Sequence, residues 1–195
     1  SVVAAAVLYD GEATAEVALN DSGVWVTNES TGMLGRFNSQ SQAIDGTLLA
    51  GSSQFDVQQQ AQRVLLTDAG VGSATPVDPA HLELGGSLRA PKGSLVAAGG
   101  ATTAVLEPEH GRLWVLSFDA AASFDEDKTK PVATIPGGGA LAVSRDRTVY
   151  VAAPRKGALY TVPTSDAGTP GKVVRRDLDV ADGAEVEVTT VGDDP

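Results

Sequence analysis

The sequence predicts an all-β protein, a β-propeller-like array of about four four-stranded blades plus strands of a further one. An apolar phrase of six residues recurs at 23–28, 63–68, 112–117 and 148–153. Each phrase is entered from a turn and left through small or polar residues. Their central residues, Trp25, Leu65, Trp114 and Tyr150, are 40, 49 and 36 positions apart. A period near 40 is typical of a propeller blade.

Composition also favours short strands over helices. The apolar residues are mainly Ala and Val, and 22 Gly and 10 Pro interrupt the chain, as expected for many strands joined by tight turns. Gln58, Gln59 and Gln60 are good helix formers, but no apolar face recurs around them at helical spacing. We therefore interpret 55–57, Phe-Asp-Val, as a strand.

The chain is expected to form one propeller-like domain, 1–195, made of repeated units. The units are roughly 13–51, 54–91, 95–136 and 138–180, with a partial unit at 184–191. In the first unit, strands are predicted at 15–19, 24–28, 33–37 and 43–49. In the second, they are predicted at 55–57, 64–67, 74–77 and 82–88. Central strands are continuously apolar because a blade between two neighbours buries both of its faces.

The third unit is less regular than the others. Its strands are predicted at 103–106 and 113–117, and its outer strands are interrupted at 119–130 and resume at 132–135. The fourth unit has predicted strands at 140–143, 149–152, 158–162 and 172–178. The alternating segment 184–190 is interpreted as the first strand of another unit. On this assignment Trp25, Leu65, Trp114 and Tyr150 occupy equivalent second-strand positions.

The two ends of the chain leave the closure of the ring open. The apolar segment 2–8 is either a strand that shares a blade with 184–190 or the stub of an upstream membrane anchor. Shared closure removes an exposed sheet edge, although Ala4-Ala5-Ala6 is a poor strand former. No apolar run approaches the roughly 18 residues that cross a bilayer.

Two phrases resemble a known repeat. Residues 143–152, Val-Ser-Arg-Asp-Arg-Thr-Val-Tyr-Val-Ala, resemble the YVTN-type propeller repeat, and so do 23–28 followed by 32–38. More narrowly, the chain resembles the propeller-like N-terminal extracytoplasmic region of large actinobacterial envelope proteins that carry fibronectin type III or Ig-like domains. The resemblance implies an extracytoplasmic, envelope-associated or secreted protein, and it brings no catalytic residues with it.

Charge and cysteine content narrow the classes of function. Twenty-five acidic residues against 14 basic ones give a net charge of −11. An acidic surface repels phosphate backbones and anionic headgroups, so neither nucleic acid nor a membrane surface is an expected partner. The absence of cysteine excludes disulfides, thiol catalysis and Cys-ligated zinc.

Three short motifs nominally match ligand-binding loops. Residues 137–142, Gly-Gly-Gly-Ala-Leu-Ala, match a dinucleotide pattern, but that pattern requires a helix where a β-run follows. In 177–185 the aspartates approach a calcium loop, yet the third Asp and the Gly arrive one position late. The acidic run 125–127 is interpreted as a solvated loop tip. We interpret all three as turns or linkers.

Histidine is too scarce for a three-histidine metal site such as some propeller lyases use. The chain has only His81 and His110, each in a predicted turn. No Gly-x-Ser-x-Gly elbow is present, and no Ser–His–Asp set can be assembled. Glycosylation sequons at 20–22 and 28–30 are interpreted as chance. The sequence assigns no catalytic, cofactor-binding or metal-binding residue, and we expect no metal or cofactor.

These observations predict a non-enzymatic binding or interaction module of a larger extracytoplasmic protein, with a protein or a cell-envelope ligand as partner. The alternatives are a propeller-type lyase or hydrolase and a structural, self-associating spacer. A homo-oligomer stays open because an incomplete ring exposes sheet edges and faces. A cluster of acids or histidines at the mouth of a central channel would favour the enzyme.

Overall fold

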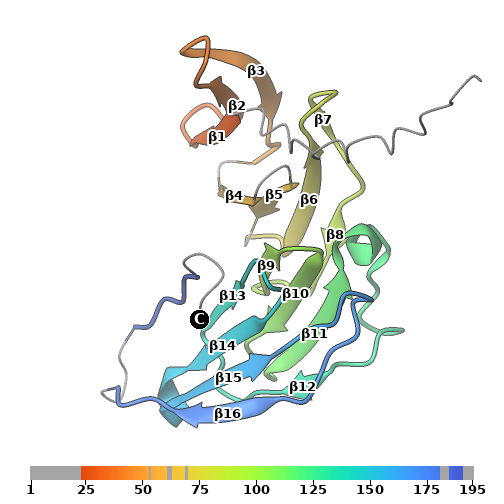
Figure 1. Cartoon of the computed structure of the whole chain (residues 1–195), viewed down its shortest axis with the longest axis vertical. Helices are drawn as coiled ribbons and strands as arrows, with labels where there is room; N and C mark the ends of the chain where they lie inside the picture. Colours follow the sequence, from red (N-terminus) through yellow and green to blue (C-terminus); the bar gives the residue numbers. More distant parts are fainter. Residues whose placement is uncertain (1–22, 53, 61–62, 69, 181–184, 191–195) are drawn as a thin grey trace, which may run out of the picture.

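The structure is a computed structural model that describes residues 23–52, 54–60, 63–68, 70–180 and 185–190. Over these residues the chain forms four antiparallel sheets (Figure 1). The first contains β1 (Gly23–Asn28), β2 (Met33–Asn38) and β3 (Ala43–Leu49). The second contains β4 (Phe55–Gln60), β5 (Arg63–Asp68), β6 (Ser73–Asp78), β7 (Glu83–Leu84) and β8 (Leu88–Arg89).

The remaining two sheets are four-stranded. The third contains β9 (Leu95–Gly99), β10 (Thr102–Glu107), β11 (Arg112–Ser117) and β12 (Ala133–Thr134). The fourth contains β13 (Ala140–Val143), β14 (Val149–Ala153), β15 (Ala158–Val162) and β16 (Val174–Asp177). Two short 3-10 helices, η1 (Phe118–Ser123) and η2 (Pro154–Lys156), follow β11 and β14. Within the described ranges, no helix has the length and apolar character needed to span a bilayer.

Three apolar clusters join the sheets in chain order. The cluster of the first and second sheets is Trp25, Leu34, Phe55, Val64, Leu66 and Val77. The cluster between the second and third sheets includes a residue of η1, and it consists of Leu65, Ala74, Leu88, Val96, Val105, Trp114 and Ala121. The cluster between the third and fourth sheets also includes Ile135, which follows β12. Its residues are Ala97, Ala104, Leu106, Leu113, Val115, Ile135, Val143, Val149, Val151, Ala153 and Val162. Successive residues of a central strand therefore face opposite neighbours, which is why such strands are apolar throughout.

The first strands of the second, third and fourth sheets lie side by side along the inner side of the array. β4 contacts β9, and β9 contacts β13. The approach of β9 to β13 is close, because a Cβ on Gly99 would lie 2.3 Å from the Val143 carbonyl oxygen. Glycine is therefore required where these two strands meet.

The glutamines of β4 bridge it to the sheets on both sides. On one side the Gln59 amide donates from Nε2 to the Gly23 carbonyl (2.7 Å) and accepts at Oε1 from the Trp25 N–H (3.0 Å). The side chain thus pairs with β1 as a neighbouring strand would. Such a paired amide satisfies backbone groups that would otherwise need another partner.

On the other side, Gln58 makes the same pair of hydrogen bonds to β9. Its Nε2 donates to the Val96 carbonyl (2.8 Å), and its Oε1 accepts from the Ala98 N–H (3.0 Å). Gln60 Oε1 accepts from the Gly100 N–H. Because side chains alternate along a strand, Gln58 and Gln60 reach one neighbouring sheet and Gln59 reaches the other.

The prediction of an all-β, propeller-like array is confirmed, and several strands have the predicted bounds. These are the strands at 43–49, 140–143 and 158–162. The strand predicted at 55–57 is longer and includes all three glutamines. The strand predicted at 82–88 is interrupted at Gly85 and Gly86, which separate β7 from β8.

The predicted equivalence of the four central residues is wrong. Leu65 and Tyr150 lie on second strands, β5 and β14, but Trp114 lies on β11, the third strand of its sheet. The reason is β9, an unpredicted first strand whose sequence, Leu-Val-Ala-Ala-Gly, has little β propensity. Trp25 lies on β1, and the strand predicted before it, at 15–19, falls outside the described residues.

Of the two predictions about the chain ends, one is wrong and the other falls outside the described residues. Segment 184–190 was predicted to be a strand, but residues 185–190 are not part of any sheet. Their exposed and half-buried residues do alternate, so the pattern is that of a strand without partners among the described residues. The segment 2–8, predicted to share a blade with 184–190, lies outside the described residues, and the shared blade stays a prediction.

Candidate functional site

The inner strands border a cavity of about 400 Å³, which we call the inner hollow. It is lined by residues of β4, β5, β9 and β13, by the start of β6 and by 186–188. Its volume falls within the range of small-molecule sites, about 300–1,000 Å³. The inner hollow is therefore large enough to hold a ligand.

The polar lining of the inner hollow is acidic and hydroxylic. Its carboxylates are Asp56, Asp68 and Glu187, and its hydroxyls are those of Thr67, Ser73 and Ser94. Among the described residues that line it there is no Lys, Arg or His. A lining of this kind favours a ligand that carries positive charge and hydrogen-bond donors.

Two hairpins position these polar groups. Asp56 of β4 lies opposite Thr67 of β5, so the two side chains project from the same face of the second sheet. The Thr67 hydroxyl donates to the Asp56 carbonyl (3.3 Å). Asp68 Oδ1 accepts from the Gly70 N–H (2.9 Å) in the turn that leads to β6. Asp56 Oδ1 accepts from the Val57 N–H (2.7 Å), so the Asp56 and Asp68 carboxylates are each held by a backbone N–H.

Ser94 adds a buried hydroxyl to the same lining. The residue is 2 % exposed, and no hydrogen-bond partner of its Oγ is found among the described residues. A buried hydroxyl without a partner costs free energy. Ser94 therefore lines the inner hollow with a buried hydroxyl whose hydrogen-bonding capacity is unused among the described residues.

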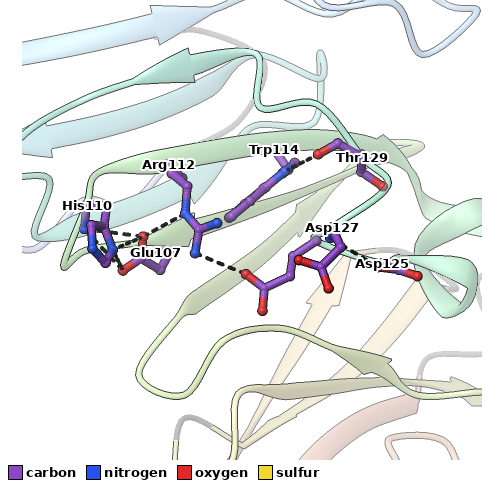
Figure 2. A network of polar contacts seen from close by, with 8 residues as sticks. Glu107, His110, Arg112, Trp114, Asp125, Asp127 and Thr129 are labelled. Carbon is purple, nitrogen blue, oxygen red and sulfur yellow. Dashed lines mark hydrogen bonds and ion pairs between the residues drawn. The ribbon is translucent and has the colours of Figure 1, made fainter.

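A second polar cluster closes the β10–β11 hairpin (Figure 2). Glu107 is 3 % exposed, and its carboxylate accepts from the His110 N–H (3.1 Å) and from Arg112 Nε (3.1 Å). Arg112 also reaches Glu126 across the sheet (3.0 Å) and lies over the Trp114 ring, 4.9 Å from its centroid. The cluster connects the hairpin to the 118–130 insertion.

Glu107 stays ionised in this cluster. Burial alone would raise the pKa of its carboxyl, but the hydrogen bonds from Arg112 and His110 outweigh burial and lower the pKa below its usual value. The Arg112 guanidinium also stabilises the negative charge. The Glu107 carboxylate therefore has a structural role: it holds the His110 backbone and the Arg112 side chain in the β10–β11 hairpin.

Glu107, Glu109 and His110 bring three possible metal-ligand atoms together, one from each residue, within 4.8 Å of one another. However, the Glu107 carboxylate is already bound to Arg112, whose permanent charge opposes a divalent cation at that place. The three residues do not fit a metal site, because the ligand with the deepest burial is neutralised by a cation of the protein.

The remaining histidine and the acidic run 125–127 also have local partners. His81 Nδ1 lies 2.8 Å from Asp78, which lowers the pKa of Asp78 and raises that of His81 by a hydrogen bond. Asp125 pairs with Lys128 at 2.6 Å. The prediction of turns for both histidines is confirmed, and each one pairs with the acid that ends the strand before its turn.

The nominal ligand-binding motifs are structural where the structure describes them. Residues 137–139 lead directly into the strand β13, so no helix N-terminus follows the glycines. Asp177 belongs to β16 and pairs with Arg175 at 2.6 Å. Part of the calcium-like stretch, 181–184, lies outside the described residues, as does the sequon at 20–22. In the other sequon, Asn28 Oδ1 accepts from the Ser30 hydroxyl (2.7 Å).

Sequence comparisons identify no relative for this chain. No family model matches it, and no curated protein matches it. The chain does resemble solved structures, and the resemblance is in the fold alone.

The solved structures that resemble it are β-propeller proteins. The dihydro-heme d1 dehydrogenase NirN, in complex with DHE, is 15% identical over 83% of this chain and 36% of that chain, with a TM-score of 0.61. Apo AztD from Citrobacter koseri is 13% identical over 87% and 51%, with a TM-score of 0.54. Selenomethionine-substituted virginiamycin B lyase from Staphylococcus aureus is 12% identical over 81% and 53%, also at 0.54.

The fold and these similarities place the chain in the class of β-propeller-like proteins. The chain spans between about one third and one half of the length of the three propeller chains. At such low identity the similarity concerns the arrangement of sheets alone, and the site must be argued from the residues of this chain.

Proposed function

We propose that this chain is a non-enzymatic binding module of a larger extracytoplasmic, envelope-associated protein, and that the inner hollow is its ligand site. The observation that carries the proposal is the acidic and hydroxylic lining of a cavity of ligand size, with Ser94 presenting a buried hydroxyl that has no partner among the described residues. Such a lining suits a cationic, hydroxyl-bearing ligand, such as an amino sugar of the cell envelope.

The lyase or hydrolase reading has less support. A general acid–base pair or an activated nucleophile needs groups within hydrogen-bonding reach of one another. Neither histidine lines the inner hollow, and each is paired with an acid near its own turn. The envelope location rests on the resemblance of the chain to the propeller-like N-terminal region of large actinobacterial envelope proteins.

Titration calorimetry with chitosan trisaccharide tests the proposal, because its amines are cationic and its ring carries hydroxyls. The N-acetylated trisaccharide, which lacks the charge, is the matched control ligand. We expect heat of binding from the cationic sugar and at least tenfold weaker binding to Asp56→Asn and Glu187→Gln. Asp119→Asn, an exposed change on η1, is the control variant. Equal binding of both sugars, or no effect of the two variants, would contradict the inner hollow as the site.

A further inference from the structure

The outer side of the fourth sheet carries a second cavity of ligand size. This sheet lies at the opposite end of the array from the first sheet (Figure 1). Val151 and Val162 point into the cluster with the third sheet. Because side chains alternate along a strand, their neighbours Tyr150 and Thr161 point away from that cluster. There they line a cavity of about 760 Å³, which we call the outer cavity, and its volume is within the range of small-molecule sites.

The floor of the outer cavity is mostly apolar and includes an aromatic ring. Thr161 lies opposite Tyr150 on one side and Val174 on the other, so the three side chains form a row across β14, β15 and β16. Leu159, in the next row, lines the cavity as well. Val174 is 43% exposed, so part of this floor is in contact with solvent. Covering it with the apolar part of a ligand is therefore favourable.

Arg176 supplies the one cation among the described residues that line the outer cavity. It lies opposite Leu159, at the β16 side of the floor. The chain has 25 acidic residues, yet within the described ranges none of them pairs with this guanidinium. A guanidinium matches a carboxylate in both charge and geometry. Arg176 is therefore placed to bind the carboxylate of a ligand that covers the floor.

Asp146 supplies the one carboxylate of the same described lining, and its own turn already holds it. It accepts from the Ser144 hydroxyl, from the Thr148 N–H (3.1 Å) and from the Thr148 hydroxyl (3.1 Å). Asp146 comes from the turn before β14, whereas Arg176 lies on β16, and two strand spacings amount to about 10 Å. The two charges thus lie on different sides of the cavity, and Asp146 does not neutralise Arg176.

Residues 188–190 form a wall of the outer cavity. A further sheet packed at the usual distance of about 10 Å from the fourth would have to displace them. The space is therefore a walled pocket and not an open sheet face. Val188 also lines the inner hollow, so the same short segment separates the two cavities.

We infer that the outer cavity is a second ligand site and that it takes an aromatic carboxylate, whose ring packs on Tyr150 and Leu159 and whose carboxylate pairs with Arg176. Packing of one aromatic ring on another is favourable beyond the area that it buries. The threonine hydroxyls of the lining can donate to the carboxylate oxygens that Arg176 leaves free. The inner hollow has the opposite preference, because acids alone supply the charge of its described lining. The two sites therefore select ligands of opposite charge.

Titration with 2-naphthylacetate, followed by the shifts of its NMR signals, tests this inference. The matched control ligands are 2-naphthylacetamide, which is uncharged, and 2-naphthylethylamine, which has the opposite charge. We expect the acid to bind about tenfold more tightly than either control, because it alone forms charge-assisted hydrogen bonds with Arg176. Binding of the amine as tightly as the acid, or no binding of the acid, would overturn the inference.

Substitutions locate the ligand. Arg176→Gln should weaken binding of the acid about tenfold and leave binding of the amide unchanged. Arg175→Gln is the matched control, because Arg175 precedes it on β16 and lies opposite Tyr160, on the other face. Thr161→Trp, in the middle of the floor, should abolish binding of both ligands while keeping the circular dichroism of the native protein. Equal effects of the two arginine variants, or unchanged binding to Thr161→Trp, would overturn the inference.

Asp56→Asn separates this site from the inner hollow. The variant changes the lining of the inner hollow alone, so it should bind 2-naphthylacetate as the native protein does. Tighter or weaker binding of the acid to Asp56→Asn would place the aromatic carboxylate in the inner hollow and overturn the outer cavity as its site. Failure of the cationic sugar to bind, in contrast, would leave this result unaffected.

Discussion

The junction between the third and fourth sheets and the junction between the first and second are built differently. The former contains eleven buried apolar residues and two inner strands in close contact at Gly99. Among the described residues the latter contains six, of which Trp25 and Leu34 come from the first sheet. Polar bridges supplement them, from Gln59 to β1 and from Arg36 Nη1 to the Pro79 carbonyl (2.5 Å).

The difference distinguishes two contributions to a sheet junction, the free energy of association and the relative orientation of the sheets. Apolar burial supplies most of the favourable free energy, at about 25 cal/mol per Å². A hydrogen bond contributes only about 0.5–1.5 kcal/mol net, but its geometry restricts how two sheets are oriented. The third and fourth sheets are therefore expected to unfold together, and the first sheet is expected to open at lower cost.

Replacing the two tryptophans tests this contrast with the largest expected effect. Trp114 is fully buried, contacts Phe124 edge-to-face and donates from its indole N–H to the Thr129 carbonyl (2.8 Å). Trp114→Ala should lower the free energy of unfolding by about 3–5 kcal/mol in a urea titration. Trp25→Ala should cost clearly less, since within the described ranges the first sheet packs on one neighbouring sheet alone. Equal losses would contradict the proposed difference between the junctions.

Gly99→Ala addresses the closest contact of the third and fourth sheets. The new methyl group would collide with the Val143 carbonyl, and we expect a loss of about 1–3 kcal/mol from the forced backbone shift. Gly139→Ala is the control, because a Cβ there would meet Pro154 at an ordinary 3.6 Å. If both variants unfold at the same urea concentration, β9 and β13 are not in tight contact.

The Glu107 cluster should make part of the stability of the third sheet depend on pH. Since its folded pKa is lowered, its contribution is present above the ordinary glutamate value of 4.5 and is lost as the pH falls through the lower folded pKa. Glu107→Gln should be less stable by about 1–2 kcal/mol at pH 7. The deficit should shrink as the pH is lowered below about 4.5.

Asp125→Asn is the matched control for that titration. Asp125 is half-buried, and its ion pair with Lys128 is on the surface, where such pairs contribute little. The hydrogen bond from Lys128 lowers the pKa of Asp125 as well, so the stability deficit of this variant should shrink over the same pH range as that of Glu107→Gln, but it should be clearly smaller. A deficit in Glu107→Gln that is constant at every pH would show that the charge of Glu107 is not involved.

The smallest expected effect is that of Gln59→Ala, which removes the bridge to β1. We expect a loss of about 1 kcal/mol and faster hydrogen exchange at the Trp25 amide, which the Gln59 side chain covers. Gln58→Ala should instead speed exchange at the Ala98 amide. Unchanged exchange at both amides would mean that the amide bridges do not persist in solution.

Much of the fold is predictable because central strands are recognisable in the sequence as short apolar runs. The runs at 64–66 and 149–153 lack charged residues, and the structure shows why for 64–66, whose residues alternate between two neighbouring sheets. The strand β9 was missed because Ala and Gly carry little strand signal, yet Gly99 is small for a reason that only its neighbour β13 reveals. Trp114 was assigned to the wrong strand as a direct result.

The candidate site could not be predicted from the sequence, because it too depends on contacts between segments that are far apart in the chain. The residues of the inner hollow come from separate segments, and the short phrases around Asp56, Asp68 and Ser94 match no ligand-binding motif. The run of three glutamines was the one available signal. It appeared as helix-forming composition, because the bonds that hold Gln58 and Gln59 are to strands 38 and 36 residues away.

The glutamine bridges also bear on how such a protein evolves. The hydrogen bonds that join Gln59 to β1 and Gln58 to β9 are made to peptide N–H and C=O groups, and every residue except proline offers both. The side chains at positions 25, 96 and 98 can therefore drift without loss of the bridge, with proline at 25 or 98 as the change that it does not tolerate. A blade attached in this way can be duplicated or exchanged between genes, because its new neighbour needs no matching side chain at the inner edge.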